Sequence, residues 1–243
     1  MQNPTAAMVV IGDEILSGRT RDANMHHLAL RLTEAGITLA EVRVVADVTA
    51  DIVAAVDALR SRYDHVFTSG GIGPTHDDIT ADAVAQAFGV GIDVREDARA
   101  VLAAFYERSG IEFNEARHRM ARIPDTALLI DNPVSAAPGF SLENVHVMAG
   151  VPAVFNAMVE SVVPTLVGGP PLLSRSVRIN RGEGDIAGPL GELARAFQDL
   201  SFGSYPFQRN GRFGANVVIR GHDEALVTEA QRQLIEIFGG EAV

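Results

Sequence analysis

The feature that most constrains the fold is a regular alternation of short apolar runs and helical segments through the first 170 residues. Residues 6–11 (AAMVVI) form a continuous apolar run, which is typical of a strand buried on both faces. Residues 22–36 have apolar side chains at helical spacing, with Gly36 placed to end the helix. Because strands and helices alternate, we expect parallel strands joined by helical crossovers. Further strands are expected at 37–47 and 64–69, and further helices at 50–62 and 79–89.

A linker divides the chain into two predicted domains. Gly168 to Pro171 (GGPP) separates the alternating region from a shorter series of strand, helix, two strands and helix. We therefore predict a three-layer α/β/α domain with a mostly parallel sheet over residues 1–168, and a small α+β domain of β-α-β-β-α order over residues 169–243. The remaining elements expected in the first domain are helices at 95–110, 114–124 and 151–166, and three short strands with a hairpin between 127 and 150.

The residue types that the chain lacks exclude several chemistries. It contains no Cys, which excludes disulfides, thiolate nucleophiles and Cys-ligated metals, and every basic side chain is Arg, none Lys. Without Lys, a Walker-type phosphate loop, a Schiff-base enzyme and a pyridoxal-phosphate enzyme are excluded as well.

The net charge limits the partners. The formal charge of −11 disfavours binding to nucleic acid and to anionic membranes, so a phosphate-bearing ligand must be held locally by backbone N–H groups, by Arg or by a bridging cation. The negative charge lies in the first 170 residues, which contain 12 Arg and 22 Asp or Glu, whereas residues 171–243 contain 8 Arg and 9 Asp or Glu. The N-terminal sequence matches neither a signal peptide nor a membrane span, so the cytoplasm is the expected location.

Four polar loops follow predicted strands, and the topology places them at the same end of the sheet. Ligands of open α/β sheets bind outside the carboxyl ends of the strands. We therefore expect these loops to share one ligand site. Their polar side chains are Asp13 and Glu14 in the first loop, Asp47 in the second, Asp77 and Asp78 in the third, and Asp131 and Asn132 in the fourth.

The third loop, TSGGIGPTHDDIT at residues 68–80, has two interpretations. Gly70, Gly71 and Gly73 allow the main chain to approach a ligand closely, and successive N–H groups before a helix can hold a phosphate. Alternatively the glycines only turn the chain and Asp78 only caps the following helix. The carboxylates of the neighbouring strand ends favour the ligand site.

Clustered carboxylates beside a phosphate-binding loop suit two roles. Carboxylate oxygens are preferred ligands of Mg²⁺, which bridges protein and substrate phosphates, and one carboxylate with a raised pKa could instead serve as a general base. Arg117, Arg119 and Arg122 lie on a short predicted helix before the fourth loop, where they form either a solvated face or phosphate contacts.

Four linked motifs carry a family resemblance. IGDEILSG at 11–18 with Asn24, GGIGPTHDDIT at 70–80, NPVSAAPG at 132–139 and AGVP at 149–152 occur in the order and spacing of the molybdopterin-binding MoaB/Mog-fold family. Residues 6–166 resemble its competence/damage-inducible protein A (CinA) branch and the related domain of eukaryotic FAD synthases, and residues 171–243 resemble the small domain that follows in CinA-type proteins. The chain departs from these relatives at Ala149, where they usually carry Pro. The nicotinamide-mononucleotide deamidase domain of full-length CinA proteins is missing, so that activity is not carried over.

The resemblance implies a pocket for a pterin or a nucleotide phosphate at the end of the sheet. In Mog-type members the residues that match Asp47 and Asp78 serve molybdopterin adenylylation. CinA-type and FAD-synthase-type members are linked to pyrophosphatase activity on ADP-ribose or FAD that depends on a divalent metal, here Mg²⁺ or Co²⁺. Asp47 and Asp78 are thus the expected catalytic residues, and Asp47, Asp77 and Asp78 the expected metal ligands. The residues expected to bind the ligand and its phosphates are Gly12, Asp13, Glu14, Asn24, Ser69, Gly70, Gly71, Gly73, Pro74, Thr75, Asn132, Pro138, Gly139 and Gly150.

Three functions stay open on the sequence. The first is a metal-dependent pyrophosphatase of the FAD or ADP-ribose type. The second is molybdopterin binding or adenylylation in molybdenum-cofactor synthesis, and the third is non-catalytic nucleotide binding. In each case the expected partner is a small phosphate-bearing molecule, and the expected assembly is a homo-oligomer, dimer or trimer.

Overall fold

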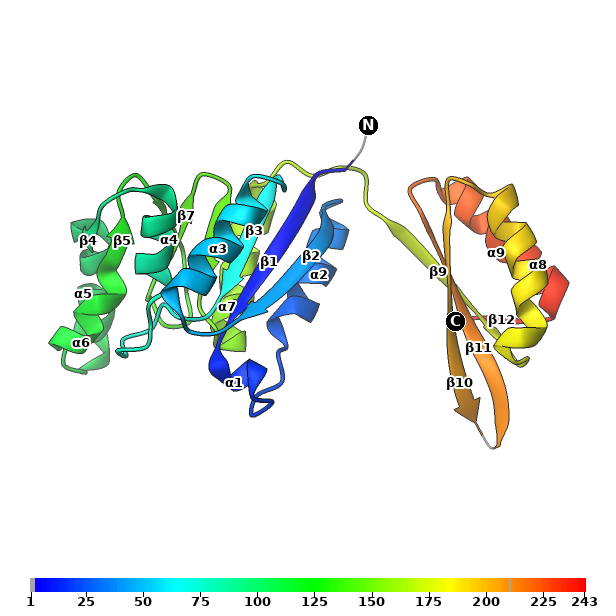
Figure 1. The fold of residues 1–243 in the computed structure, drawn as a ribbon, viewed down its shortest axis with the longest axis horizontal. Helices are drawn as coiled ribbons and strands as arrows, with labels where there is room; N and C mark the ends of the chain where they lie inside the picture. The colour runs from blue at the N-terminus through cyan, green and yellow to red at the C-terminus, as the bar shows by residue number, and fades with distance from the viewer. Residues whose placement is uncertain (1–2, 210) are drawn as a thin grey trace. The chain divides into compact units, whose positions relative to one another are not determined.

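The computed structural model describes residues 3–209 and 211–243. The chain divides into two compact units, Met1–Gly169 and Pro170–Val243, and Figure 1 follows it from the blue N-terminus to the red C-terminus. The larger unit contains the four predicted polar loops.

A six-stranded sheet in the order β2-β1-β3-β8-β7-β6 forms the centre of the larger unit. Strands β2, β1, β3 and β8 are parallel, whereas β7 runs antiparallel to both of its neighbours. Five strands therefore point the same way, and their carboxyl ends lie at one end of the sheet, as expected. The strands are β1 (Thr5–Ile11), β2 (Thr38–Val45), β3 (His65–Ser69), β6 (Leu128–Ile130), β7 (Gly139–Leu142) and β8 (Val145–Met148).

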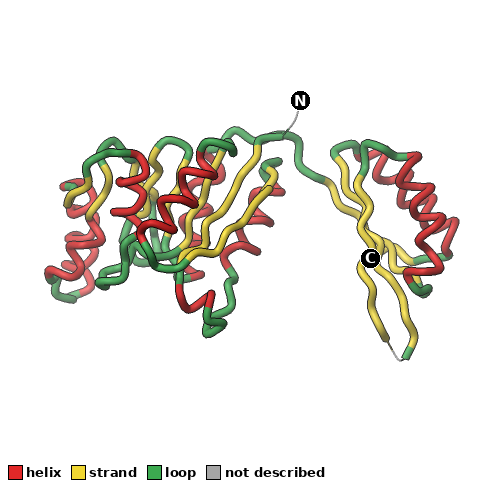
Figure 2. The backbone as a smooth tube through the Cα atoms, in the orientation of Figure 1, coloured by secondary structure: helices red, strands yellow, loops and turns green. Residues whose placement is uncertain are grey.

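Helices cover both faces of this sheet, which confirms the predicted three-layer architecture (Figure 2). The residues of β1 are buried on both faces because successive side chains point to opposite sides. Ala7, Val9 and Ile11 pack with α3 (Thr49–Arg60), α4 (Thr80–Phe88) and α5 (Glu96–Ser109), whereas Ala6, Met8 and Val10 pack with α2 (Asn24–Glu34) and α7 (Pro152–Val162).

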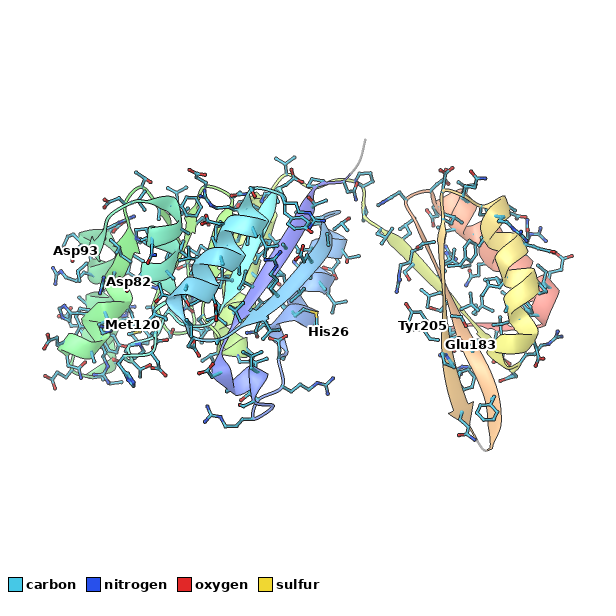
Figure 3. All side chains as sticks on the ribbon, in the orientation of Figure 1. His26, Asp82, Asp93, Met120, Glu183 and Tyr205 are labelled. Carbon is cyan, nitrogen blue, oxygen red and sulfur yellow. The ribbon has the colours of Figure 1, made fainter. Side chains whose placement is uncertain are left out.

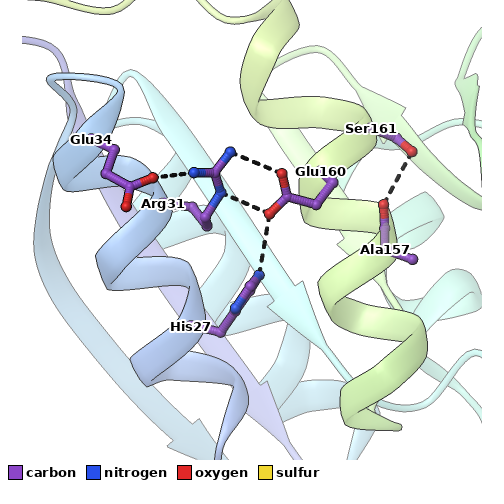
Figure 4. A network of polar contacts seen from close by, with 6 residues as sticks. All are labelled: His27, Arg31, Glu34, Ala157, Glu160 and Ser161. Atoms are coloured by element: carbon purple, nitrogen blue, oxygen red, sulfur yellow. Dashed lines mark hydrogen bonds and ion pairs between the residues drawn. The ribbon is translucent and has the colours of Figure 1, made fainter.

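An ionic contact links the two helices of the second face. Arg31 on α2 donates from Nη2 to Oε2 of Glu160 on α7 at 2.8 Å, and His27 Nε2 lies 3.6 Å from the same carboxylate (Figure 4). Arg31 also pairs with Glu34 one turn further along α2. All of these side chains are partly open to solvent, so the contact adds little beyond the apolar packing of α2 on α7.

Two short segments differ from the predictions. Residues 114–124 do not form one helix ended by Pro124: α6 (Glu115–His118) and a 3-10 turn, η1 (Arg119–Ala121), are followed by strand β5 (Arg122–Pro124), which pairs with β4 (Ile92–Val94). The loop after β1 contains a one-turn helix, α1 (Asp13–Leu16). Each of these elements is three or four residues long, too short to show a periodic apolar pattern. A 3-10 turn, η2 (Val163–Thr165), follows α7.

The smaller unit has the predicted strand, helix, two strands and helix, with one additional strand. Its antiparallel sheet has the order β10-β11-β9-β12, and two helices bury one face in a separate apolar core. None of the helices in the described residues is long and apolar enough to span a membrane. The elements are β9 (Leu173–Ile179), α8 (Glu183–Ala196), β10 (Ser201–Arg209), β11 (Arg212–Gly221), α9 (Glu224–Phe238) and β12 (Glu241–Ala242).

Candidate functional site

A pocket of about 510 Å³ lies at the carboxyl end of the six-stranded sheet. It is formed by the loops that follow β1, β2, β3, β6 and β8, so chain segments far apart in sequence meet there. Its polar wall carries the carboxylates of Glu14, Asp47, Asp77 and Asp78. Among the described residues, no Arg or His side chain lines this pocket. An anionic ligand therefore needs backbone donors or a cation.

The glycines after β3 adopt a backbone that other residues avoid. Gly70 has φ +110° and Gly71 has φ +71°, and a Cβ at Gly71 would lie 2.1 Å from Thr80 Oγ1. The Thr80 N–H donates to the Gly71 carbonyl at 2.9 Å, which ties the start of the loop to the start of α4. Both glycines line the pocket. The loop thus brings main chain rather than side chain to the ligand, as the phosphate-binding interpretation requires.

Asp78 stabilises this loop instead of capping α4. Its Oδ2 accepts a hydrogen bond from the Thr75 backbone N–H at 2.7 Å and a second from the Thr75 hydroxyl. The N-cap of α4 is Ile79, without a side-chain hydrogen bond, so the alternative in which Asp78 only caps the helix is wrong. The physical reason is that Asp78 lies two residues before the first helical residue, where its carboxylate faces back into its own loop. Its Oδ1 is not used by these two bonds.

Asp47 has an unusual electrostatic position at the end of β2. Its Oδ2 accepts a hydrogen bond from the Asp13 backbone N–H at 2.9 Å, which joins the first and second loops. Burial raises the pKa of Asp47 above its ordinary value. The hydrogen bond from Asp13 lowers the pKa by less than burial raises it, and the charges of Asp13, Glu14 and Asp77 add to the increase. A carboxylate with a raised pKa, beside other carboxylates, is suited to accept a proton or to gain a cation.

Asn24 connects the loops from behind the pocket. Its Nδ2 donates to Ser69 Oγ at 2.7 Å and to the Gly150 carbonyl at 2.8 Å, while its buried Oδ1 has no hydrogen-bond partner. Asn24 and Ser69 line a smaller cavity that shares Glu14 and Gly150 with the pocket. The amide therefore positions the ends of β3 and β8 relative to α2.

Asn132 forms the turn of the fourth loop. Its Oδ1 accepts from the backbone N–H groups of Val134 and Ser135, and its Nδ2 donates to Ser135 Oγ at 2.7 Å and to the Ala137 carbonyl at 2.8 Å. The side chain is 3% exposed, and all of its polar atoms are satisfied within the loop. Asn132 thus fixes the shape of the pocket wall.

The structure brings most of the predicted site residues into one pocket and places the others around it. The apolar part of the wall was not predicted, because single apolar residues in loops carry no periodic signal. The predicted residues that line the pocket are Gly12, Glu14, Asp47, Gly70, Gly71, Gly73, Pro74, Asp77, Asp78, Asn132 and Gly150. Asp13, Asn24, Ser69, Thr75, Pro138 and Gly139 do not line it. The additional lining residues are Ile11, Thr20, Ile72, Met120, Ser135, Ala137, Ala149, Val151, Pro152 and Val154.

The predicted metal ligands Asp47, Asp77 and Asp78 line the same pocket but form no ready-made cluster. Among the described residues, no three Asp, Glu or His side chains converge closely enough to hold a metal ion by themselves. Mg²⁺ usually takes only one or two carboxylates and completes its shell with substrate phosphates and water. Asp47, Asp77 and Asp78 offer only carboxylate oxygens, and Asp47 is surrounded by other negative charges. These residues therefore fit a Mg²⁺-like ion that binds together with a phosphate-bearing ligand.

Comparison with known proteins identifies both units. Residues 7–168 match the model of the probable molybdopterin binding domain, and residues 171–243 match that of the FAD synthase middle domain. A crystal structure of the protein CinA, of unknown function, from Thermoplasma acidophilum has 31% sequence identity and a TM-score of 0.61, and covers 68% of this chain and 99% of that one.

Two curated relatives match most or all of the chain. A Pyrococcus furiosus protein is 32% identical over 238 residues, which is 93% of this chain and 93% of the relative. A probable FAD synthase of Caenorhabditis briggsae is 30% identical over the whole of this chain, which spans 51% of the length of that relative. The chain therefore belongs to the molybdopterin-binding domain family, in a CinA-like form that continues into an FAD-synthase-type middle domain.

Proposed function

We propose that the protein binds a nucleotide pyrophosphate in the pocket at the carboxyl end of the sheet and hydrolyses it with a divalent metal ion. The observation that carries this proposal is the meeting of a glycine main-chain wall with Glu14, Asp47, Asp77 and Asp78 in one pocket of about 510 Å³. That volume suits a nucleotide-sized ligand. Substrates of the FAD or ADP-ribose type contain the required P–O–P bridge.

Each part of the pocket has a role in this reaction. Backbone N–H groups of the loop at Gly71 to Gly73 hold one phosphate, and Ile72 with Met120 contributes apolar contacts. Asp47, Asp77 and Asp78 would hold the divalent ion, Mg²⁺ or Co²⁺, which supplies the positive charge that the lining lacks.

Water is the nucleophile of the proposed reaction. Asp47 accepts a proton from the attacking water. Water forms a new P–O bond at one phosphorus, the bridging P–O bond breaks, and the products are AMP and a second phosphate monoester. The apolar wall around Val151 and Val154 surrounds the remaining part of the ligand.

A second candidate function is molybdopterin binding or adenylylation. It is favoured by the match of residues 7–168 to the probable molybdopterin binding domain. Non-catalytic nucleotide binding is the third possibility. The expected homo-oligomer and the expected cytoplasmic location stay predictions.

The test compares three substrates. Purified protein is incubated with FAD, ADP-ribose and adenylylated molybdopterin, with Mg²⁺, with Co²⁺ or with a chelator, and AMP is quantified by chromatography. We expect metal-dependent AMP release in the wild type and its loss in Asp78→Asn. Asp93→Asn is the matched control, because Asp93 is exposed on β4 away from the pocket (Figure 3).

The outcomes separate the three functions. AMP from FAD or ADP-ribose supports the nucleotide pyrophosphatase, and AMP from adenylylated molybdopterin alone supports a role in cofactor synthesis. Tight binding of a nucleotide without turnover under any metal condition overturns the hydrolase in favour of non-catalytic binding.

A further inference from the structure

An arginine without a partner lies beside the pocket. Three Arg side chains follow one another on α6, η1 and β5, and two of them are engaged: Arg122 donates to Asp82 at 2.5 Å, and Arg117 donates to the Glu112 carbonyl and lies over the Tyr106 ring. Arg119 is the exception. Within the described residues it has no ion pair, and its Nε is shielded from solvent without a hydrogen-bond partner.

A shielded guanidinium nitrogen without an acceptor is costly. Removing a charged donor from water without a partner costs more than removing a neutral one, so such groups in folded proteins call for a partner that the chain itself does not provide. Arg is also the side chain best matched to phosphate, because its planar fork donates two parallel hydrogen bonds. The unpartnered Arg119 thus has the chemistry of an anion-binding residue.

The position of Arg119 connects it to the ligand pocket. It lines a small cavity of about 20 Å³, which holds about one water-sized atom. Four pocket residues of the glycine loop, Gly71, Ile72, Gly73 and Asp78, line this cavity too. Met120, the neighbour of Arg119, lines both as well, and Figure 3 labels it together with Asp82 on α4. Arg119 therefore lies at a cavity that adjoins the ligand pocket along the glycine loop.

Charge balance supports the same assignment. The pocket lining contains four carboxylates and, within the described residues, no cationic side chain. Arg122 is already neutralised by Asp82 at the adjoining cavity, so Arg119 is the guanidinium there that can neutralise a ligand phosphate. A monophosphate is satisfied by the glycine loop alone, whereas a diphosphate brings a second anionic group that needs its own partner.

We propose that Arg119 binds one phosphate of a diphosphate ligand, next to the phosphate held by the loop at Gly71 to Gly73, and so makes the pocket selective for diphosphates over monophosphates. The proposal rests on the proposed function in one respect only, namely that the ligand carries a pyrophosphate. It does not require that the ligand is hydrolysed. Arg119 is a binding and specificity residue in this proposal.

The experiment measures binding without turnover. Affinities of inorganic pyrophosphate, ADP-ribose and AMP are determined by calorimetry with a chelator present, for the wild type, Arg119→Gln and Arg119→Lys. Arg117→Gln is the matched control from the same segment. We expect Arg119→Gln to weaken pyrophosphate and ADP-ribose binding about 10- to 100-fold and AMP binding less than about 3-fold, as a charge-assisted hydrogen bond is lost. Arg119→Lys should regain part of the difference.

The results distinguish this proposal from the proposed function. Equal affinities of wild type and Arg119→Gln for both diphosphates, or equal weakening of AMP, overturns the role of Arg119 and leaves the hydrolase untouched. A selective loss in Arg119→Gln without any AMP release in the turnover assay supports Arg119 and removes the hydrolase. A wild type that binds none of the three ligands in the presence of the chelator overturns the role of Arg119, and the hydrolase is then decided by the turnover assay with metal. Because Arg119 has no polar partner to lose, its variants should keep the wild-type melting temperature, which is measured in parallel.

Discussion

The two ends of the six-stranded sheet differ in whether their polar side chains have hydrogen-bond partners. At the carboxyl end, Asp47 is partly buried among other carboxylates, and buried polar atoms of Asn24 and Arg119 have no partner. At the opposite end, Thr5 donates its N–H and its hydroxyl to Asp64, and Asn144 donates to two backbone carbonyls at 2.9 Å. The first end keeps binding capacity free, whereas the second uses its polar groups to hold the strands together.

A buried histidine belongs to the opposite end as well. His146 at the start of β8 is 5% exposed, its Nδ1 lies 2.8 Å from Ser141 Oγ, and its ring packs on Phe67. His65 on β3 lies 3.4 Å from its Nε2. Unlike the carboxylates of Glu14, Asp47, Asp77 and Asp78, neither histidine lines the pocket at the carboxyl end. The difference suggests that substitutions at the two ends should separate activity from stability.

Asp47→Asn should give the largest effect and the clearest separation. If Asp47 accepts the proton of the attacking water, AMP release falls on the order of 100- to 10,000-fold. The free energy of unfolding should stay equal or rise, because the amide removes a partly buried negative charge that Asp13, Glu14 and Asp77 repel. Turnover and urea denaturation of the same preparations measure both quantities. A parallel loss of activity and stability would contradict the assignment of this end to function.

His146 should make the protein sensitive to acid from the opposite end. Burial, together with the smaller effect of the charge of His65, lowers the pKa of His146 to about 4, so the unfolded chain takes up the proton first as the pH falls. The free energy of unfolding is therefore constant above about pH 6.5 and decreases by roughly 3 kcal/mol towards pH 4. Urea denaturation at a series of pH values measures the slope.

The matched variants assign this slope to the buried ring. His146→Gln should flatten it, leaving the contribution of His65, whose pKa burial lowers too. His76→Gln should leave it unchanged, because His76 lies exposed in the pocket loop and is solvated before and after unfolding. An unchanged slope in His146→Gln would place the acid-sensitive group elsewhere.

Asn144→Ala should destabilise the protein without reducing ligand binding. The variant loses two hydrogen bonds, to the carbonyls of Arg60 and Tyr63, which tie the β7–β8 turn to the end of α3. The expected loss is roughly 2 kcal/mol of unfolding free energy, measured by urea denaturation. Asn144→Asp removes the same donors and should behave alike. A weakened affinity for ADP-ribose in either variant would show that the two ends are coupled.

The sequence predicted the framework of this comparison better than its details. The alternation of apolar runs and helices placed β1, β2 and β3 and their loops correctly, because parallel strands joined by helices have their carboxyl ends, and the loops that follow, at one end of the sheet. The role of Asp78 could not be derived from the sequence. A carboxylate at the first position before a helix can cap it, whereas Asp78 lies two residues before α4 and closes its own loop, and the sequence does not locate the helix start to within one residue. The hydrogen bonds of Asn24 join positions 45 and 126 residues away, and such contacts exist only after folding.

Short elements were missed for a related reason. Strands β4 and β5 have three residues each and are defined by their pairing with one another. Strand β5 begins at Arg122, directly after the 3-10 turn that holds Arg119. The single predicted helix therefore put Arg117, Arg119 and Arg122 on one element, whereas the structure places them on three. Local propensity is a weak guide where tertiary pairing decides the conformation.

Glu160→Gln should have the smallest effect. It tests whether a polar contact away from both sheet ends changes stability or turnover. Glu160 joins α7 to Arg31 and His27 of α2, on a helical face away from both ends (Figure 4). Because these side chains are partly solvated, the loss should stay under about 1 kcal/mol and shrink further in high salt. Melting temperature at low and high salt measures it, and AMP release serves as the control. A loss as large as that of Asn144→Ala, or a change in turnover, would show that the packing of α2 on α7 transmits to the pocket through Asn24, the first residue of α2.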